Sequence, residues 1–483
     1  MGIVLKQSFK NTITIYIAFA IGGVNALFLY TSFLSESYYG LVTFLLSTSN
    51  LLMPLTAFGV QYTILKFFSS YKTQEEKDVF LSSVILLPLV VAVPIAVFGS
   101  LFYTEIARFL SLENPMIASY TFVIYWVAVA TAYFEIFYAW AKVQLQSVYG
   151  NVLKEMFSRV ASMILLFAVY FEWIAPDDFV YYLVAAYFIR LLLMAVYALK
   201  LYRPKFTLSL PKNYKEILKY SLFILLSGAA GTILLDIDKF MIPQKEAIAL
   251  TAYYAVAVYI GSVVETPGRA MSQILQPLVA KALNEQNWRE VKSLYRKSSI
   301  NLFLIAGFVF LIINVNVQAL YLLLPAKYSG GILVVLLISL AKLYHMLLGV
   351  NGAIISNSKY YKILLPYGLA MAVTVYLLND YLIDVLSIEG AALSTFLVVL
   401  VFNTIKLVYV RQKFGFFPFV KNTGVLCLLL LLFFFGFKFW DFTFHPVVNI
   451  FLKSVLLTLC YFGVVYKLKI SEDVNALMAR VFS

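Results

Sequence analysis

Long apolar segments, separated by short polar breaks, recur along the whole chain. Fourteen such segments can be distinguished, and most reach the roughly 20 residues that an α-helix needs to span a bilayer. Hydrophobic residues make up 62% of the 483 residues and charged residues only 13%, about half of the charged share in a typical soluble domain. The sequence therefore predicts an all-α polytopic membrane protein with about 14 transmembrane helices.

The predicted spans form two sets of six, followed by two more near the C-terminus. They cover residues 11–33, 39–63, 79–103, 116–140, 152–172, 178–199, 216–238, 250–276, 299–323, 329–352, 361–379, 390–410, 422–439 and 446–466.

Basic residues alternate between the breaks. Most of the 37 Lys and Arg residues lie in or beside every second break or near the chain ends, among them Lys142, Lys154 and Lys406. Lys453 is one of the few assigned to the opposite, outer loops. Because cytoplasmic loops carry an excess of Lys and Arg, we expect both termini to be cytoplasmic and the protein to be a multi-pass protein of the cell (inner or plasma) membrane. The formal net charge of +13 then follows from topology, and no nucleic acid partner is expected. Two His and two Cys residues favour neither a metal site nor a disulfide framework.

A weak repeat relates the two halves of the chain. At a constant offset, Lys66 corresponds to Lys281 and Glu75 to Glu290. Six spans separate the copies, so both have the same orientation, as in a parallel duplication. The pattern predicts an N-terminal six-helix lobe at residues 1–210, a C-terminal six-helix lobe at 211–415, and two additional helices with a cytoplasmic tail at 416–483. Two such lobes suit a transporter that exposes a mid-membrane cleft to each side in turn.

Five short stretches, in this order and spacing, carry a family resemblance. They are Lys10–Thr12, Ser37–Leu41, Phe58–Val60, Leu235–Phe240 and Ala252–Tyr254. Together they resemble the polysaccharide transport (O-antigen flippase) family of the multidrug/oligosaccharidyl-lipid/polysaccharide exporter superfamily. The resemblance implies twelve to fourteen spans in two six-helix lobes. It also implies a flippase that moves a polyprenyl-pyrophosphate-linked oligosaccharide from the cytoplasmic to the outer leaflet during surface polysaccharide biosynthesis.

The last two predicted spans fall outside the repeat and are rich in Leu and Phe over Leu428–Phe437. In the lipid II flippase branch two extra helices frame a hydrophobic groove for the polyprenyl tail, and the resemblance implies the same here. The alternative is that these helices only add bulk to the bundle.

Basic residues inside spans are candidate contacts for an anionic headgroup, because an unpaired charge at the bilayer centre costs about 2.5–3.5 kcal/mol even on the mildest scale. Three were identified: Arg190, Arg269 and Lys342. Arg190 either faces a cavity or extends along its helix to the interface. Glu265 and Arg269 are four residues apart, so they are predicted to pair on one helix face. Pro267 lies between them and predicts a kinked helix that serves as a moving part; the alternative is a static structural pair.

Several other polar residues are weaker candidates. Lys342 and His345 share a helix face and suit either pyrophosphate binding or proton coupling. Glu135 is expected to pair with Lys342 or Arg190, or to bind a coupling cation. Asp236 and Asp238 are expected to end a helix at the outer face and solvate its turn, or to form an outer gate.

Competing functions differ in the residues they require. The chain has no G-x-x-x-x-G-K-[ST] phosphate loop and no long polar loop with catalytic acids, so we expect no enzyme activity and no cofactor. A membrane-embedded polysaccharide polymerase is therefore disfavoured. A multidrug extruder favours acidic residues in its cavity, whereas the charged residues predicted inside the spans of this chain are mainly basic. Lipid II remains an alternative substrate. Expected partners are the lipid-linked oligosaccharide, membrane lipids, and a polysaccharide polymerase with glycosyltransferases.

Overall fold

The computed structural model describes residues 2–476, and within that range it consists of helices and connecting turns. The helices group into two compact units. Unit 1 comprises Met1–Ala255 and Leu365–Ser387, and unit 2 comprises Val256–Leu364 and Ile388–Ser483. The boundaries between the units therefore lie inside two helices, α13 and α18, rather than in loops.

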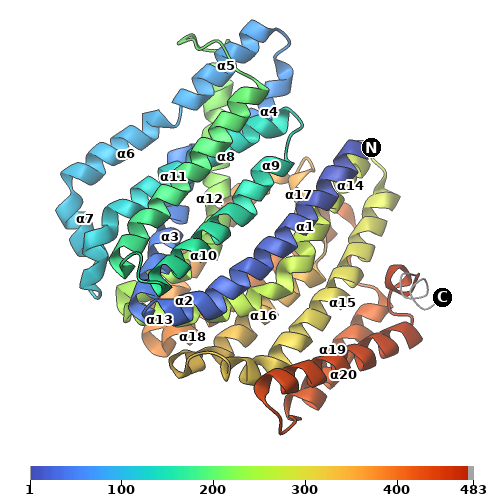
Figure 1. The fold of residues 1–483 in the computed structure, drawn as a ribbon. Helices are drawn as coiled ribbons and strands as arrows, with labels where there is room; N and C mark the ends of the chain where they lie inside the picture. The colour runs from blue at the N-terminus through green and yellow to red at the C-terminus, as the bar shows by residue number, and fades with distance from the viewer. Residues whose placement is uncertain (1, 477–483) are drawn as a thin grey trace. The chain divides into compact units, whose positions relative to one another are not determined.

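Unit 1 contains the first half of the chain (Figure 1). Its elements are α1 (Gly2–Val24), η1 (Asn25–Leu29), α2 (Tyr30–Phe33), α3 (Glu36–Ala57), α4 (Val60–Phe67), η2 (Phe68–Ser70), α5 (Gln74–Leu86), α6 (Leu89–Leu101), α7 (Tyr103–Leu110), η3 (Pro115–Tyr120), α8 (Thr121–Val143), α9 (Val148–Val152), η4 (Leu153–Phe157), α10 (Ser158–Tyr170), α11 (Pro176–Leu201) and α12 (Tyr214–Lys245).

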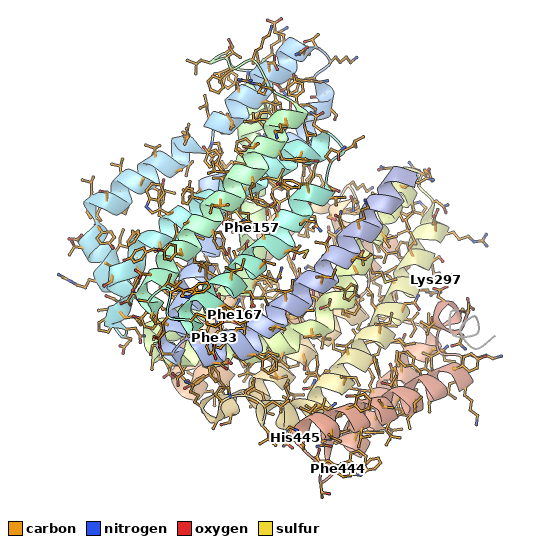
Figure 2. All side chains as sticks on the ribbon, viewed as in Figure 1. Phe33, Phe157, Phe167, Lys297, Phe444 and His445 are labelled. Carbon is orange, nitrogen blue, oxygen red and sulfur yellow. The ribbon has the colours of Figure 1, made fainter. Side chains whose placement is uncertain are left out.

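The core of unit 1 is built around α8, which packs against α3, α4 and α11. Phe134 and Trp140 of α8 are buried there beside Phe80. On a neighbouring surface α10 contacts α2, where the rings of Phe33 and Phe167 lie 5.6 Å apart (Figure 2). Close aromatic packing of this kind adds to the energy of simple burial.

Local sequence signals explain where helices of unit 1 begin and end. The Ser35 hydroxyl accepts a hydrogen bond from the backbone N–H of Tyr38 and so caps α3, as Ser commonly does. The helix stops at Phe58 and Gly59, which both have positive φ, 51° and 68°. Gly59 also lies against α12, where a Cβ would approach Ile224 to 2.5 Å. Only glycine tolerates both the positive φ and the close contact with α12 at position 59. The turn at these two residues interrupts the predicted span 39–63.

Unit 2 contains most of the second half. Its elements are the end of α13 (Ile248–Ser262), η5 (Val263–Glu265), α14 (Thr266–Asn284), α15 (Trp288–Tyr321), η6 (Ala326–Gly331), α16 (Ile332–Leu347), α17 (Asn351–Ser356), η7 (Tyr361–Ile363), the part of α18 (Leu364–Phe414) that follows Ser387, α19 (Lys421–Lys438) and α20 (Pro446–Lys467).

Helix α15 is the centre of unit 2 and packs against α14, α16, α19 and α20. The last two form an adjacent pair, with Phe444 and His445 in the turn between them (Figures 1 and 2). A hydrogen bond also links α20 to α15: the hydroxyl of Tyr461 donates to the Leu304 carbonyl at 2.9 Å. The C-terminal pair is therefore an integral part of unit 2.

Twelve helices among the described residues are long and apolar enough to cross a membrane. The difference from the predicted fourteen has two sources. The stretch Tyr361–Phe414 counts as one span of 54 residues, although the backbone of Ser387 in its interior is non-helical, so that two helices meet there at a kink. The stretch Val148–Tyr170 carries Lys154, Glu155 and Arg159 and is absent from the twelve. The count of fourteen stays a prediction, as does the division into lobes at residues 1–210, 211–415 and 416–483.

Candidate functional site

A carboxylate–lysine pair lies within the helices of unit 1. Glu135 projects from α8 and Lys154 from η4, and Glu135 Oε1 lies 2.6 Å from Lys154 Nζ. The side chain of Glu135 is 15% exposed and that of Lys154 is 42% exposed. Glu135 thus forms its ion pair with the lysine of a neighbouring helix, and the predicted ion pair with Arg190 is absent from the described part of unit 1.

Two local features bring Lys154 to α8. Gly150 of α9 lies directly against the ring of Tyr138, where a Cβ would stand only 2.1 Å from the nearest ring carbon. The next turn, Leu153–Phe157, is a π-helix, which widens the helix by one residue and shifts the side chains that follow it. Close approach and altered helical phase together position the lysine beside the carboxylate.

Arg190 of α11 belongs to the same region but is enclosed. Its guanidinium lies 4.5 Å from the ring centroid of Phe134 and 4.6 Å from that of Tyr187. It donates hydrogen bonds to Ser158 Oγ at 2.9 Å and Thr131 Oγ1 at 3.3 Å, and the residue is only 6% exposed. The side chain does not extend to the interface, so that alternative is wrong. Its charge is dispersed over two aromatic faces and two hydroxyls.

Lys142 completes the charged cluster of unit 1. Its Nζ lies 3.8 Å from the ring centroid of Tyr138, and it interacts electrostatically with Glu135, as does Arg190. Three cationic side chains thus surround Glu135. A second carboxylate, Glu155, interacts electrostatically with Lys154 and Arg190, but its charge is balanced by Arg159 at 3.2 Å. We call Glu135, Lys142, Lys154 and Arg190 the unit 1 cluster; it has an excess of two positive charges.

Unit 2 contains a second carboxylate–lysine pair. Glu265 Oε2 lies 2.6 Å from Lys342 Nζ on α16. The predicted ion pair between Glu265 and Arg269 is absent from the described residues. The reason is local: Glu265 ends the 3-10 turn η5, and α14 starts after it with Pro267 in its first turn. The two residues therefore do not share one continuous α-helix, which an i, i+4 pair requires.

Other predicted residues gather around this pair. Arg269 is exposed and interacts electrostatically with Glu265. The ring nitrogen Nδ1 of His345 lies 3.4 Å from the Asn403 amide nitrogen, and Lys406 contributes a further positive charge near His345. The helix break predicted at Pro267 is present.

Asp236 and Asp238 do not end a helix, because α12 continues to Lys245. Both carboxylates are buried within unit 1. Asp236 forms an ion pair with Lys239 at 3.0 Å. Asp238 accepts hydrogen bonds from Asn379 Nδ2 at 2.7 Å and from the Tyr254 hydroxyl. Hydrogen bonds of this kind offset the cost of burying the charge, so the expectation of two solvated turn residues is wrong.

Sequence reasoning missed Lys142, Lys154 and Lys406, because it assigned every basic residue near a helix end to a cytoplasmic loop. It also placed Lys453 in an outer loop, whereas this lysine is buried on α20. A signal was present for Lys154: three charged residues within six positions of a helix are unusual for a lipid-facing segment.

Three hollows in unit 2 lie away from the charged clusters. One of about 320 Å³ is lined by residues of α15, α16 and α19, among them Val317, Leu336, Phe434 and Lys438. A second, of about 550 Å³, lies where α14 and α18 end, and a third, of about 330 Å³, lies beside Lys297 and Asp473; neither contains any of the predicted site residues. The described residues contain no group of three or more His, Cys, Asp or Glu side chains arranged to hold a metal ion.

Three solved structures have a similar fold. The lipid II flippase MurJ in an inward closed conformation matches over 95% of this chain and 99% of its own, with a TM-score of 0.68 and 13% identity. An inward-facing multidrug resistance MATE family transporter of the MOP superfamily matches over 82% and 94%, with a TM-score of 0.63 and 14% identity. The Vibrio cholerae MATE transporter VcmN in the bent form matches over 86% and 98%, with a TM-score of 0.56 and 13% identity. The predicted fold class is confirmed.

The sequence also matches a known family. The profile described as "Polysaccharide biosynthesis protein" covers residues 4–283, which is more than half of the chain, whereas no curated protein sequence matches at a significant level. That the chain is not an enzyme stays a prediction. The resemblance noted in the sequence is thus confirmed, and the chain belongs to the polysaccharide biosynthesis protein family.

Proposed function

We propose that this protein moves a polyprenyl-pyrophosphate-linked oligosaccharide from the cytoplasmic to the outer leaflet by alternating access. One observation carries the proposal: each unit holds, within its helices, a lysine–carboxylate pair accompanied by further cations. Buried charge in a membrane protein is costly and marks a substrate or ion pathway. An excess of positive charge suits a pyrophosphate.

The hollow beside α19 suits the polyprenyl tail. Its wall is apolar at Val317, Leu336 and Phe434, and Lys438 and Glu389 add polar groups. An apolar groove with charged residues in its lining can hold a hydrocarbon chain while the headgroup stays in a polar environment. This favours a role for α19 in substrate binding over the alternative that it only adds bulk.

The proposal includes a location and partners. With both termini cytoplasmic, transport would run outward across the plasma membrane, from glycosyltransferases that complete the lipid-linked sugar to a polymerase that consumes it. Arg269, Lys342 and His345 are the proposed headgroup contacts of unit 2. Glu265 and Pro267 are proposed to control their position.

Two other cargoes would use the same fold. Lipid II also carries a polyprenyl pyrophosphate, so the charged clusters suit it equally. A cationic drug is disfavoured, because the unit 1 cluster has three cations against one carboxylate and would repel it.

Transport in reconstituted vesicles tests the proposal. A fluorescent polyprenyl-pyrophosphate-linked oligosaccharide is placed in both leaflets, and a membrane-impermeant reductant bleaches the outer one. Wild-type protein should make the inner pool accessible. Arg269→Ala should slow this at least 10-fold, whereas the control Arg289→Ala, an exposed arginine at the start of α15, should not. Export of a cationic drug without movement of the lipid would overturn the proposal.

A further inference from the structure

The exposure of the two cations nearest to Glu135 differs sharply. Arg190 is 6% exposed, with aromatic rings against its guanidinium and hydroxyls on its nitrogens. Lys154 is 42% exposed at its side chain. A bound headgroup can therefore reach the Lys154 ammonium, whereas it can reach Arg190 only by displacing the packing around it.

The charge of the unit 1 cluster matches a particular ligand class. Lys142, Lys154 and Arg190 outweigh Glu135 by two positive charges. A pyrophosphate esterified at both ends carries two negative charges at neutral pH, so its arrival would neutralise the cluster. Charge-assisted bonds from lysine to phosphate oxygen are among the stronger hydrogen bonds in proteins.

The carboxylate has a role while the site is empty. Without Glu135, three cations would face one another inside a helical bundle, and unpaired charge there is expensive. The 2.6 Å contact with Lys154 lowers that cost. The same contact must break before Lys154 can donate fully to a phosphate, so Glu135 competes with the substrate for the lysine.

We propose that Lys154 is the headgroup ligand of unit 1 and that Glu135 is its exchangeable counter-ion. On binding, the ammonium moves from the carboxylate to a phosphate oxygen, and Lys142 remains near Glu135 to balance its charge. On release, Glu135 recaptures Lys154 and so prevents the headgroup from binding too tightly for turnover. Arg190 is a positioning residue that acts through the field of the cluster. This inference rests on the proposed function, since it assigns ligands to the same substrate.

The arrangement in unit 2 follows the same pattern. Glu265 holds Lys342 at 2.6 Å, and Arg269 adds a further positive charge. In each unit one carboxylate holds one lysine from a different helix, which is the geometry expected if each unit has its own site with the same chemistry.

The inference is tested by substitutions whose effects differ according to whether Lys154 binds the headgroup or only forms a structural ion pair with Glu135. Glu135→Gln frees the lysine and should tighten binding of the lipid-linked oligosaccharide about 10-fold, a change of about 1.4 kcal/mol, while it slows transport. Lys154→Gln should weaken binding at least 10-fold. The exchanged variant, Glu135→Lys with Lys154→Glu, should fold as the wild type does, as judged by size-exclusion chromatography and thermal unfolding, but it should not transport the lipid.

The control is the exposed pair Lys281–Glu285 at the end of α14, at 3.8 Å. Its exchanged variant, Lys281→Glu with Glu285→Lys, should transport normally. Full transport by the exchanged Glu135 and Lys154 variant, or wild-type affinity in Lys154→Gln, would show that the pair is only structural and would overturn the inference.

Failure of the proposed function gives a different result. If the wild-type protein does not move the lipid-linked oligosaccharide, that function fails, and inorganic pyrophosphate then tests the site by itself. Tighter binding of pyrophosphate by Glu135→Gln, and weaker binding by Lys154→Gln, would still support the exchange. Equal binding by all three proteins would refute it.

Discussion

The buried ammonium group of Lys453 allows a quantitative test of how unit 2 balances its charges. Lys453 on α20 is 1% exposed, and its Nζ lies 2.9 Å from Asp441 Oδ1 and donates to the Val315 carbonyl at 2.9 Å. Asp441, in the turn before α20, is 50% exposed at its side chain. The two partners are thus hydrated very differently. Removing one partner of a buried pair costs about 3–5 kcal/mol when the other charge stays buried.

The two single substitutions should therefore differ strongly. Asp441→Ala leaves the Lys453 charge buried, with only the Val315 carbonyl for compensation, so we expect a loss of about 3 kcal/mol, at the lower end of that range. Lys453→Met removes the buried charge and keeps most of the side-chain volume. Asp441 then remains in water and keeps its hydrogen bond from Asn449, at 3.1 Å. The expected change is within about 1 kcal/mol.

The measurement is denaturant-induced unfolding of the purified protein in detergent, with the variants compared side by side. The control is Asp380→Ala, because its partner Lys245 keeps Asp384 at 2.8 Å and an exposed pair is worth less than about 1 kcal/mol. If Lys453→Met destabilises as much as Asp441→Ala, the argument that the buried charge sets the cost is refuted.

Two further outcomes follow from single contacts in the two units. Gly150→Ala should destabilise the protein by about 1–3 kcal/mol through overpacking, because the new methyl group meets the Tyr138 ring. The control Gly99→Ala, whose methyl group meets nothing within 4 Å, should not destabilise it. Equal stability of the two variants would contradict the close packing of Gly150 on Tyr138. Partial burial raises the pKa of Asp441, but the hydrogen bonds from Lys453 and Asn449 and the positive charge of Lys453 together outweigh this and hold the pKa below its usual value. Since the folded pKa is the lower one, the pair contributes fully above the unfolded pKa of about 3.9 and its contribution is lost as the pH falls below that value. The difference in unfolding free energy between wild type and Asp441→Ala should shrink from pH 7 to pH 3, and a constant difference would count against the pair.

Much of the architecture could be predicted from the sequence because hydropathy is a local property. Predicted span 178–199 corresponds to α11 (Pro176–Leu201), and span 446–466 to α20 (Pro446–Lys467). A run of apolar residues must satisfy its own backbone hydrogen bonds in a bilayer, and a helix does this within the segment. Family membership followed from short stretches read in order, which also requires no tertiary contact.

The identity of charge partners could not be predicted in this way. Glu265 was assigned to Arg269 by its spacing, but a 3-10 turn changed the helix phase and Lys342 became its partner. Lys154 was assigned to a loop because it is basic and near a helix end, although a π-helical turn brings it to Glu135. Such short irregular turns alter which face a side chain occupies without altering the hydrophobicity of the segment.

The sequence by itself thus determined the fold class, most of the membrane-spanning segments and the family, because these depend on residues close together in the chain. Only the tertiary structure decided which cations of the helices are enclosed, as Arg190 is, and which are accessible, as Lys154 is. The physical reason is that the energy of a buried charge depends on the atoms within a few ångströms of it. Those atoms come from helices far apart in sequence, and their rotation and packing are set by the whole unit.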